Sequence, residues 1–261
     1  MPLMRGVFME ETKDKKRCGF KDRFALIWAL ETRFPLPESW WPKETVPGSK
    51  YVALIPLAGG ILGVLTALLV CILSHYISPY AAAWLGAMFY ALFGWGIHLD
   101  GWADVWDGIG SGKSGEELHA VIKDTKTGAF AIIGIVLALG TWTSLAAYIP
   151  IEKRFSAIVL AAVCGRFAEA SACYFGKYPW ENGLVDCVAA FDGGDFALAL
   201  LCIVPFAFFA LDYCAMSAML CFVIGAMGAS YMNKKMGGTN GDVLGAVEIL
   251  GELATLLVFA A

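Results

Sequence analysis

The sequence predicts an all-α protein, a polytopic bundle of about seven transmembrane helices with an interfacial helix near its N-terminus. Of its 261 residues, 59% are hydrophobic and only 16% are charged, whereas an average soluble domain has roughly 25% charged residues. The mean hydropathy is +0.66, and apolar runs of about 20 residues, enough for a helix to cross a bilayer, recur along the chain. These observations exclude a disordered chain and argue strongly against a water-soluble enzyme.

Two segments precede the first predicted span. Residues 1–23 are polar and carry charges of both signs, and they lack the apolar core of a signal peptide, so we expect a cytoplasmic segment. Residues 24–34 have apolar side chains at helical spacing, and Trp40 and Trp41 follow shortly after them. This pattern is typical of an interfacial helix with an aromatic belt. Residues 24–261 together form the predicted integral membrane domain.

Seven apolar runs predict the spans. The stretch 196–232 has a single charge, Asp212, and as one helix it would extend about 55 Å, well beyond a hydrocarbon core of about 30 Å. We therefore expect the chain to fold back near Asp212, with Pro205 either kinking the first helix or marking a shorter, re-entrant one. The predicted spans are residues 51–73, 80–97, 129–151, 155–175, 196–211, 213–232 and 243–261.

The basic residues predict the orientation of these spans. If the N-terminus is cytoplasmic, the loops at 98–128, 176–195 and 233–242 share that side, which then holds 16 of the 19 Lys and Arg residues, as the positive-inside rule expects. The same topology gathers eight aspartates from these loops on the cytoplasmic side. The sequence therefore predicts a multi-pass protein of the cytoplasmic membrane with its active face toward the cytoplasm.

The stretch HLDGWADVWDG, residues 98–108, is the most informative motif. Asp100, Asp104 and Asp107 stand at i, i+4 and i+7 and share one face of a helix. Because three like charges repel one another, the pattern favours a bound cation, and oxygen-only ligands suit Mg²⁺ or Mn²⁺. The alternative is a solvated acidic helix end. His98 is either a proton acceptor or a packing residue.

Two further segments supply phosphate-binding chemistry. The segment KDTKTG, residues 123–128, places Lys123, Asp124 and Lys126 beside hydroxyls and a glycine, although it could also be an ordinary basic flank of a span. The segment GGTNGDVLG, residues 237–245, is a glycine-rich turn in which Gly241 and Asp242 start a helix. Backbone N–H groups at such a helix start can bind an anion, while the aspartate can bind a metal or cap the helix.

Four charged residues lie inside predicted spans. Glu248 and Glu252 are one helical turn apart in the last span, and Arg166 precedes Glu169 by three residues. Buried acids are costly in a membrane helix, so they should face protein, water or a cation. Arg166 either neutralises Glu169 or binds a phosphate.

Together these motifs resemble the cobalamin synthase family, the adenosylcobinamide-GDP ribazoletransferases. The resemblance rests first on residues 98–108, then on Lys123 and Asp124 with Gly128, and on the segment 241–246 with Glu252. The segment TRFPLP, residues 32–37, and the pair Gly183 and Leu184 are also similar to the family, so the resemblance covers about residues 24–261. Glu248 departs from the family pattern, because it stands one position early.

The resemblance implies a Mg²⁺-dependent membrane enzyme that joins adenosylcobinamide-GDP to α-ribazole, or to its 5′-phosphate, with release of GMP. The predicted site residues fall into three groups. The catalytic residues are His98, Asp104 and Asp107. The substrate-binding residues are Lys123, Asp124, Lys126, Arg166 and Gly241. The metal ligands are Asp100, Asp104, Asp107, Asp242 and Glu252.

Three other functions remain open from the residues alone. A different Mg²⁺-dependent membrane phosphotransferase or a prenyltransferase would also hold a diphosphate on clustered aspartates. A cation transporter could use Glu169, Glu248 and Glu252 as a pathway across the bilayer. No cluster of basic and aromatic residues suits a nucleic acid, and the sequence leaves a homo-oligomer open.

Overall fold

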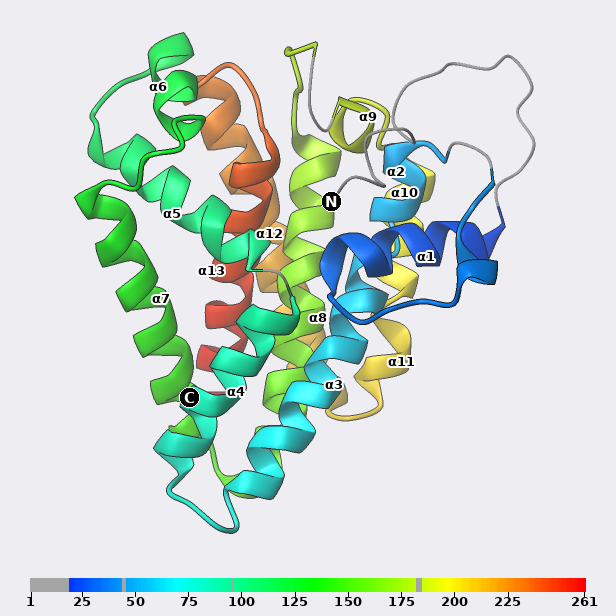
Figure 1. Ribbon diagram of the computed structural model, residues 1–261, viewed down its shortest axis with the longest axis vertical. Coiled ribbons are helices and arrows are strands. Elements are labelled where there is room, and N and C mark those ends of the chain that lie inside the picture. The colour runs from blue at the N-terminus through cyan, green and yellow to red at the C-terminus, as the bar shows by residue number, and fades with distance from the viewer. Residues whose placement is uncertain (1–18, 44–45, 95, 182–184) are drawn as a thin grey trace.

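The computed structural model describes residues 19–43, 46–94, 96–181 and 185–261, and within these ranges every regular element is a helix (Figure 1). Among the described residues, five helical segments are long and apolar enough to cross a membrane. The predicted all-α membrane bundle is thus confirmed. The five are α2 (Gly48–Val52) with α3 (Ile55–Leu73), α7 (Ala129–Tyr148), α8 (Ile151–Phe175), α12 (Leu211–Lys235) and α13 (Gly241–Ala260).

The number of spans among the described residues is five or six, lower than the predicted seven. A sixth span is obtained only by joining α4 (Pro79–Phe93) and α5 (Ile97–Gly110), which meet at a bend of 93°. The predicted span 196–211 is instead a short helical segment, α10 (Gly193–Leu201) and α11 (Val204–Ala207). Its 15 residues extend about 22 Å, less than the core of about 30 Å. The chain does fold back before Asp212, because α12 begins at Leu211.

Helix α8 is the centre of the bundle. It packs against α3, α12 and α13, and 89% of its apolar 18-residue stretch is buried inside the protein. Small residues permit this close packing: a side chain at Gly165 would collide with Glu252 of α13. By contrast α7 and α12 expose large apolar side chains such as Val136 and Met227, which is the surface expected of lipid-facing helices.

The N-terminal helix α1 (Phe20–Glu31) begins four residues earlier than the apolar pattern indicated, because Gly19 and Asp22 cap its start. It runs across the direction of α3 and α8 (Figure 1), as predicted for an interfacial helix. Its last residue, Glu31, is buried in the bundle. A 3-10 turn, η1 (Glu38–Trp40), follows. Most of the predicted polar segment 1–23 lies outside the described residues.

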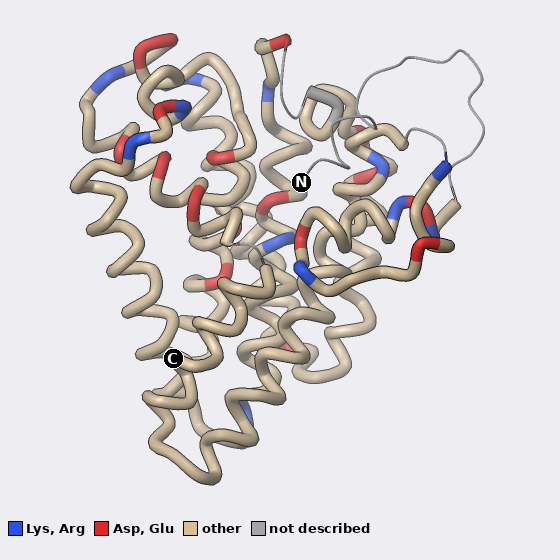
Figure 2. Tube along the Cα trace, in the orientation of Figure 1, with Lys and Arg blue, Asp and Glu red and all other residues tan. Residues whose placement is uncertain are grey.

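The polar connections gather at one end of the bundle. Helix α6 (Gly115–Ile122), helix α9 (Val185–Val188) and the turn between α12 and α13 all lie at that end, while the α3–α4 and α7–α8 connections lie at the other (Figure 1). Most acidic residues follow the same division (Figure 2). The structure therefore brings the three predicted loops to one face.

Helices α5 and α13 cross in direct backbone contact. A Cβ atom on Gly101 would lie 2.7 Å from the carbonyl oxygen of Asp242, and one on Gly245 would lie 2.9 Å from the Cα atom of His98. Only glycine fits at such distances. This crossing places the aspartates of α5 beside the start of α13.

We expect Gly245→Ala to destabilise the protein by about 1–3 kcal/mol, because the added methyl group must push α5 away from α13. The measurement is the melting temperature in detergent. Gly140→Ala in α7 is the matched control, since a Cβ there meets no atom within 4 Å, and it should be neutral or stabilise the helix. Equal melting temperatures for both variants would contradict the proposed close contact.

Candidate functional site at the polar end of the bundle

Helix α5 directs its three aspartates away from its packed side. Gly96, with a φ of 69°, adopts the left-handed conformation that precedes the helix. Trp102 and Val105 are buried, and the indole nitrogen of Trp102 donates to the carbonyl oxygen of Gly134 on α7 at 2.8 Å. The other side of the helix carries Asp100, Asp104 and Asp107, of which Asp107 contacts the start of α7.

We call Asp100, Asp104, Asp107 and Asp242 the aspartate face. The Asp104 carboxylate interacts electrostatically with the other three aspartates and with Lys123. Asp100 is exposed, whereas Asp104 is half-buried. The structure thus brings together the predicted carboxylates of α5 and Asp242 of α13, which are far apart in the sequence, whereas Glu252, the other predicted metal ligand of α13, contacts Arg166 and Tyr90 instead.

Asp107 of the aspartate face caps the start of α7. Its two carboxylate oxygens accept the backbone N–H groups of Gly128 at 2.5 Å and Ala131 at 2.8 Å, at the start of α7. The carboxylate therefore caps α7 from a neighbouring helix, where the helix dipole also favours a negative charge. A side chain at Gly128 would collide with Asp107. Both predicted roles of Asp107, as catalyst and as metal ligand, compete with these bonds.

Asn240, rather than Asp242, caps α13, so the Asp242 carboxylate has side-chain partners in place of the helix amides. The Asn240 side chain accepts the backbone N–H of Val243 at 3.1 Å and donates to Asp242 at 3.0 Å. Lys123 binds the same Asp242 oxygen at 2.6 Å. The predicted anion-binding segment and the glycine-rich turn therefore meet at one ion pair.

Three of the other predicted substrate-binding residues belong to the same two segments as this pair, whereas Arg166 does not. Asp124 and Lys126 are exposed, and the Asp124 side chain accepts the backbone N–H of Lys126. Gly241 is the first residue of α13. On α6, His119 stacks on Trp180 with ring centroids 4.1 Å apart, and burial and the nearby Lys123 lower the pKa of His119. This neutral stacked pair is a site feature that the motifs did not indicate.

The aspartate face has the chemistry of a magnesium site without a preformed metal cage. No group of three or more His, Cys, Asp or Glu side chains in the described ranges is arranged to hold a metal ion. All the candidate metal ligands of the aspartate face are carboxylate oxygens. The ammonium group of Lys123 neutralises Asp242, so this carboxylate already binds a cation. Mg²⁺ commonly binds through one or two carboxylates, water and substrate phosphates. The residues present fit this mode of binding.

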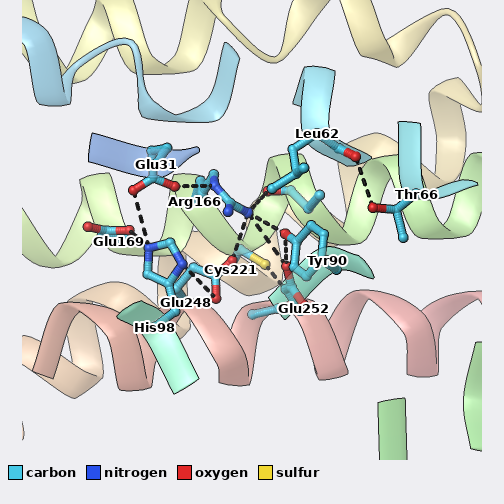
Figure 3. A network of polar contacts seen from close by, with 12 residues as sticks. Glu31, Leu62, Thr66, Tyr90, His98, Arg166, Glu169, Cys221, Glu248 and Glu252 are labelled. Atoms are coloured by element: carbon cyan, nitrogen blue, oxygen red, sulfur yellow. Dashed lines mark hydrogen bonds and ion pairs between the residues drawn. The ribbon is translucent and has the colours of Figure 1, made fainter. Parts of the chain in front are cut away.

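A second group of predicted residues lies deeper, in what we call the buried network: Glu31, Tyr90, His98, Arg166, Glu169, Glu248 and Glu252 (Figure 3). Arg166 is 1% exposed. Its guanidinium group binds Glu31 at 2.8 Å, Glu248 at 2.9 Å and Glu252 at 3.6 Å. It also donates to the Tyr90 hydroxyl, which in turn donates to Glu252.

His98 completes the buried network. Its Nε2 atom lies 3.2 Å from Glu169 and 3.5 Å from Glu31, and its Nδ1 atom lies 3.8 Å from Glu248. Glu169 therefore faces His98 rather than Arg166, its neighbour by sequence spacing. Because three glutamates enclose the imidazole, the geometry favours a positioning role for His98. Its role as a proton acceptor stays a prediction.

The predicted site thus consists of two groups. Glu252 follows Asp242 by ten positions of α13, about 15 Å along the helix axis, and Glu252 and Arg166 belong to the buried network. Glu31, Tyr90 and Asn240 were not predicted as site residues. Glu31 is a charged residue at the end of an apolar helix, and nothing in the sequence alone pairs it with His98 and Arg166. Asn240 bonds within the start of its own helix, so its place just before α13 is the local signal of a cap. Gly183 and Leu184, which contributed to the resemblance, lie outside the described residues.

Comparison with known proteins identifies the family of the chain. Residues 23–260 match the family model described as cobalamin-5-phosphate synthase. The adenosylcobinamide-GDP ribazoletransferase of Rhizobium johnstonii is 28% identical over 89% of this chain and 94% of its own. The proteins of the same name from Shigella boydii and Escherichia coli are 26% and 27% identical, over 89% of this chain and 98% of their own. No solved structure matches. The family match spans both the aspartate face and the buried network, and the chain belongs to the cobalamin-5-phosphate synthase family.

Proposed function

We propose that this protein is an adenosylcobinamide-GDP ribazoletransferase, which joins adenosylcobinamide-GDP to α-ribazole or its 5′-phosphate and releases GMP. The observation that carries the proposal is the meeting of Asp100, Asp104, Asp242 and Lys123 at one end of a membrane bundle. The names of the relatives in Rhizobium johnstonii and Shigella boydii support the same substrates.

The reaction is a phosphoryl transfer. A hydroxyl oxygen of α-ribazole attacks the phosphorus next to cobinamide and forms a new P–O bond. The bond from this phosphorus to the bridging oxygen breaks, and GMP leaves with that oxygen. The hydroxyl proton passes to a carboxylate of the aspartate face. Catalysis of such a transfer consists mainly of positioning and of neutralising charge on the phosphate oxygens.

The residues of the site divide this work. Asp100, Asp104 and Asp242 would hold Mg²⁺, which neutralises charge on the diphosphate. Lys123 and Lys126 bind phosphate oxygens, and the ion pair with Asp242 at 2.6 Å keeps Lys123 at the aspartate face. The N–H groups at the start of α13, near Gly241, offer further donors to an anion. Asp107 keeps α5 and α7 together through the amides of Gly128 and Ala131.

We also propose that the membrane is the cytoplasmic one and that the polar end of the bundle faces the cytoplasm. The support is the excess of basic residues in the loops that the structure gathers at this end. Both substrates are water-soluble, so a site at this surface is reached without crossing the bilayer.

The proposal is tested with purified protein, adenosylcobinamide-GDP, α-ribazole and Mg²⁺. We expect GMP to appear in equal amount to the corrinoid product, and a chelator such as EDTA to stop its release. Liberation of GMP at the same rate without α-ribazole would identify a hydrolase instead. Uptake of a cation into proteoliposomes without any nucleotide substrate would favour the transporter, for which Glu169, Glu248 and Glu252 were considered.

A further inference from the structure

Helix α6 is held on α5 by its apolar side. Leu118 and Ile122 are 0% exposed, and atoms of both lie within 3.0 Å of the place where a Cβ atom on Gly108 of α5 would be. Glu116 and Glu117, on other sides of α6, are exposed. Helix α6 therefore adds a fixed and accessible surface to the polar end of the bundle (Figure 1).

Three functional groups share one accessible side of this helix. With about 3.6 residues per turn, Glu116, His119 and Lys123 fall within about 60° of arc and follow one another over about 10 Å along the axis. Lys123 directly follows the helix, and its backbone N–H still donates to the carbonyl oxygen of His119 at 3.0 Å. His119 interacts electrostatically with both other side chains and with Asp242. The order along α6 is thus a carboxylate, a flat ring and the ammonium group that binds Asp242.

The His119 ring belongs to what we call the aromatic platform: Tyr178, Trp180 and His119. The imidazole stacks on the indole of Trp180 with centroids 4.1 Å apart and planes 10° apart. The Tyr178 ring lies across the indole, with centroids 5.2 Å apart and planes 86° apart. All three side chains are partly exposed. Such a platform suits a further planar ring, which can extend the stack.

The aromatic platform is fixed to the turn that precedes α13. The backbone N–H of Thr239 donates to the carbonyl oxygen of Lys177 at 2.7 Å, and a Cβ atom on Gly238 would lie 2.8 Å from the Trp180 ring. Asp242 follows Thr239 by three positions. The platform and the aspartate face are therefore attached to the same turn.

We propose that Glu116 and the aromatic platform bind the guanine base of adenosylcobinamide-GDP, a subsite that deepens the proposed function and rests on it. One edge of guanine carries two hydrogen-bond donors, N1–H and the 2-amino group, and an ionised carboxylate accepts both. The base stacks on His119, its donor edge reaches Glu116, and the diphosphate reaches Lys123. The three groups of α6 thus follow the order of edge, base and phosphate in a guanosine nucleotide.

Other bases match this strip of α6 less well. Adenine has a hydrogen-bond acceptor, N1, where guanine has a donor, so the Glu116 carboxylate would repel it. The base of α-ribazole is bonded to its ribose through one nitrogen and has no N–H for a carboxylate. The carboxylate at one end of the strip therefore selects guanine.

The first test measures the binding of GMP and AMP to the purified protein by equilibrium dialysis, without turnover. We expect the wild-type protein to bind GMP at least about tenfold more tightly than AMP, about 1.4 kcal/mol, and Glu116→Ala to lose this preference by weakening GMP binding alone. Glu117→Ala is the matched control, because Glu117 is also exposed but faces about 100° away from Glu116. Equal affinities for GMP and AMP in the wild-type protein, or an unchanged preference in Glu116→Ala, overturn the proposal.

The second test measures the steady-state kinetics of His119→Ala. We expect the KM for adenosylcobinamide-GDP to rise at least about tenfold while the KM for α-ribazole stays unchanged. His119→Phe, which keeps a flat ring, should restore most of the loss. A rise in the KM for α-ribazole alone would assign the aromatic platform to the acceptor base and overturn the proposal, as would two unchanged KM values. Because Glu116 is exposed, the first test decides even if His119→Ala does not fold.

The two tests separate this subsite from the proposed function. A guanine preference that Glu116→Ala loses and Glu117→Ala keeps supports the subsite even if the wild-type protein releases no GMP from adenosylcobinamide-GDP. An active transferase in which Glu116→Ala and His119→Ala behave like the wild-type protein would keep the proposed function and exclude the subsite.

Discussion

Asp104→Asn is expected to lower the rate of GMP release by about 10²–10³-fold while the protein remains folded in the membrane. Asp104 is the residue of the aspartate face that interacts with every other charge there, including Asp242 and Lys123. The substitution keeps its shape and removes its charge, so the face loses its hold on a cation and on the phosphates that this cation would neutralise. Losses of this size are typical when a preorganised electrostatic contact to a reacting group is removed. The measurement is GMP release at saturating substrates.

The matched control is Asp212→Asn. Asp212 is an exposed aspartate at the start of α12, at the opposite end of the bundle, and its loss should leave the rate unchanged. If Asp104→Asn retained wild-type turnover, the aspartate face would not be the active site. A similar loss in both variants would point to an effect on the fold or on expression rather than on the reaction.

Arg166→Met is expected to give the largest loss of stability, about 3–5 kcal/mol, which corresponds to a fall in Tm of about 10 °C for a chain of this size. Arg166 binds three carboxylates and is 1% exposed. Removing the guanidinium group leaves these carboxylates buried without their main cationic partner. Because Glu31 belongs to α1, the variant should also loosen the attachment of α1 to the bundle. The measurement is thermal unfolding in detergent.

Arg154→Met provides the comparison. Arg154 is also buried, but the acceptors of its hydrogen bonds among the described residues are neutral: the Ser74 hydroxyl and the carbonyl oxygens of Ala147 and Ile149. Its loss leaves no charge behind and should cost less. Adding Glu31→Gln to Arg166→Met should restore part of the stability. Equal losses for the two arginine variants, with no rescue, would show that the glutamates do not depend on Arg166 for neutralisation.

The sequence predicted the elements whose signals are local. The i, i+4, i+7 spacing placed Asp100, Asp104 and Asp107 on one helix, and the charge pattern of the loops predicted that Asp242 would share their end of the bundle. The spans 129–151 and 243–261 were recovered within a few residues as α7 and α13. These features follow from helical periodicity and from the cost of exposing polar groups to lipid.

The sequence could not predict which charges pair across helices. Arg166 was predicted to bind substrate because a guanidinium group suits a phosphate. In the structure it binds Glu31 and Glu248, which lie 135 and 82 residues away, and no local pattern connects the three residues. The capping of α7 by Asp107 is a similar case, because it depends on where α5 meets a distant helix start. Hydropathy alone also counted 196–211 as a span, although its helices are too short.

We propose that carboxylates of α5 and α13 together hold a divalent ion on the diphosphate. The most direct test of this proposal is electron paramagnetic resonance of Mn²⁺, titrated into the protein with adenosylcobinamide-GDP but no acceptor. We predict that the wild-type protein binds Mn²⁺ and that Asp104→Asn and Asp242→Asn each weaken this binding, while Asp212→Asn does not. Undiminished Mn²⁺ binding in both Asp104→Asn and Asp242→Asn would contradict the account.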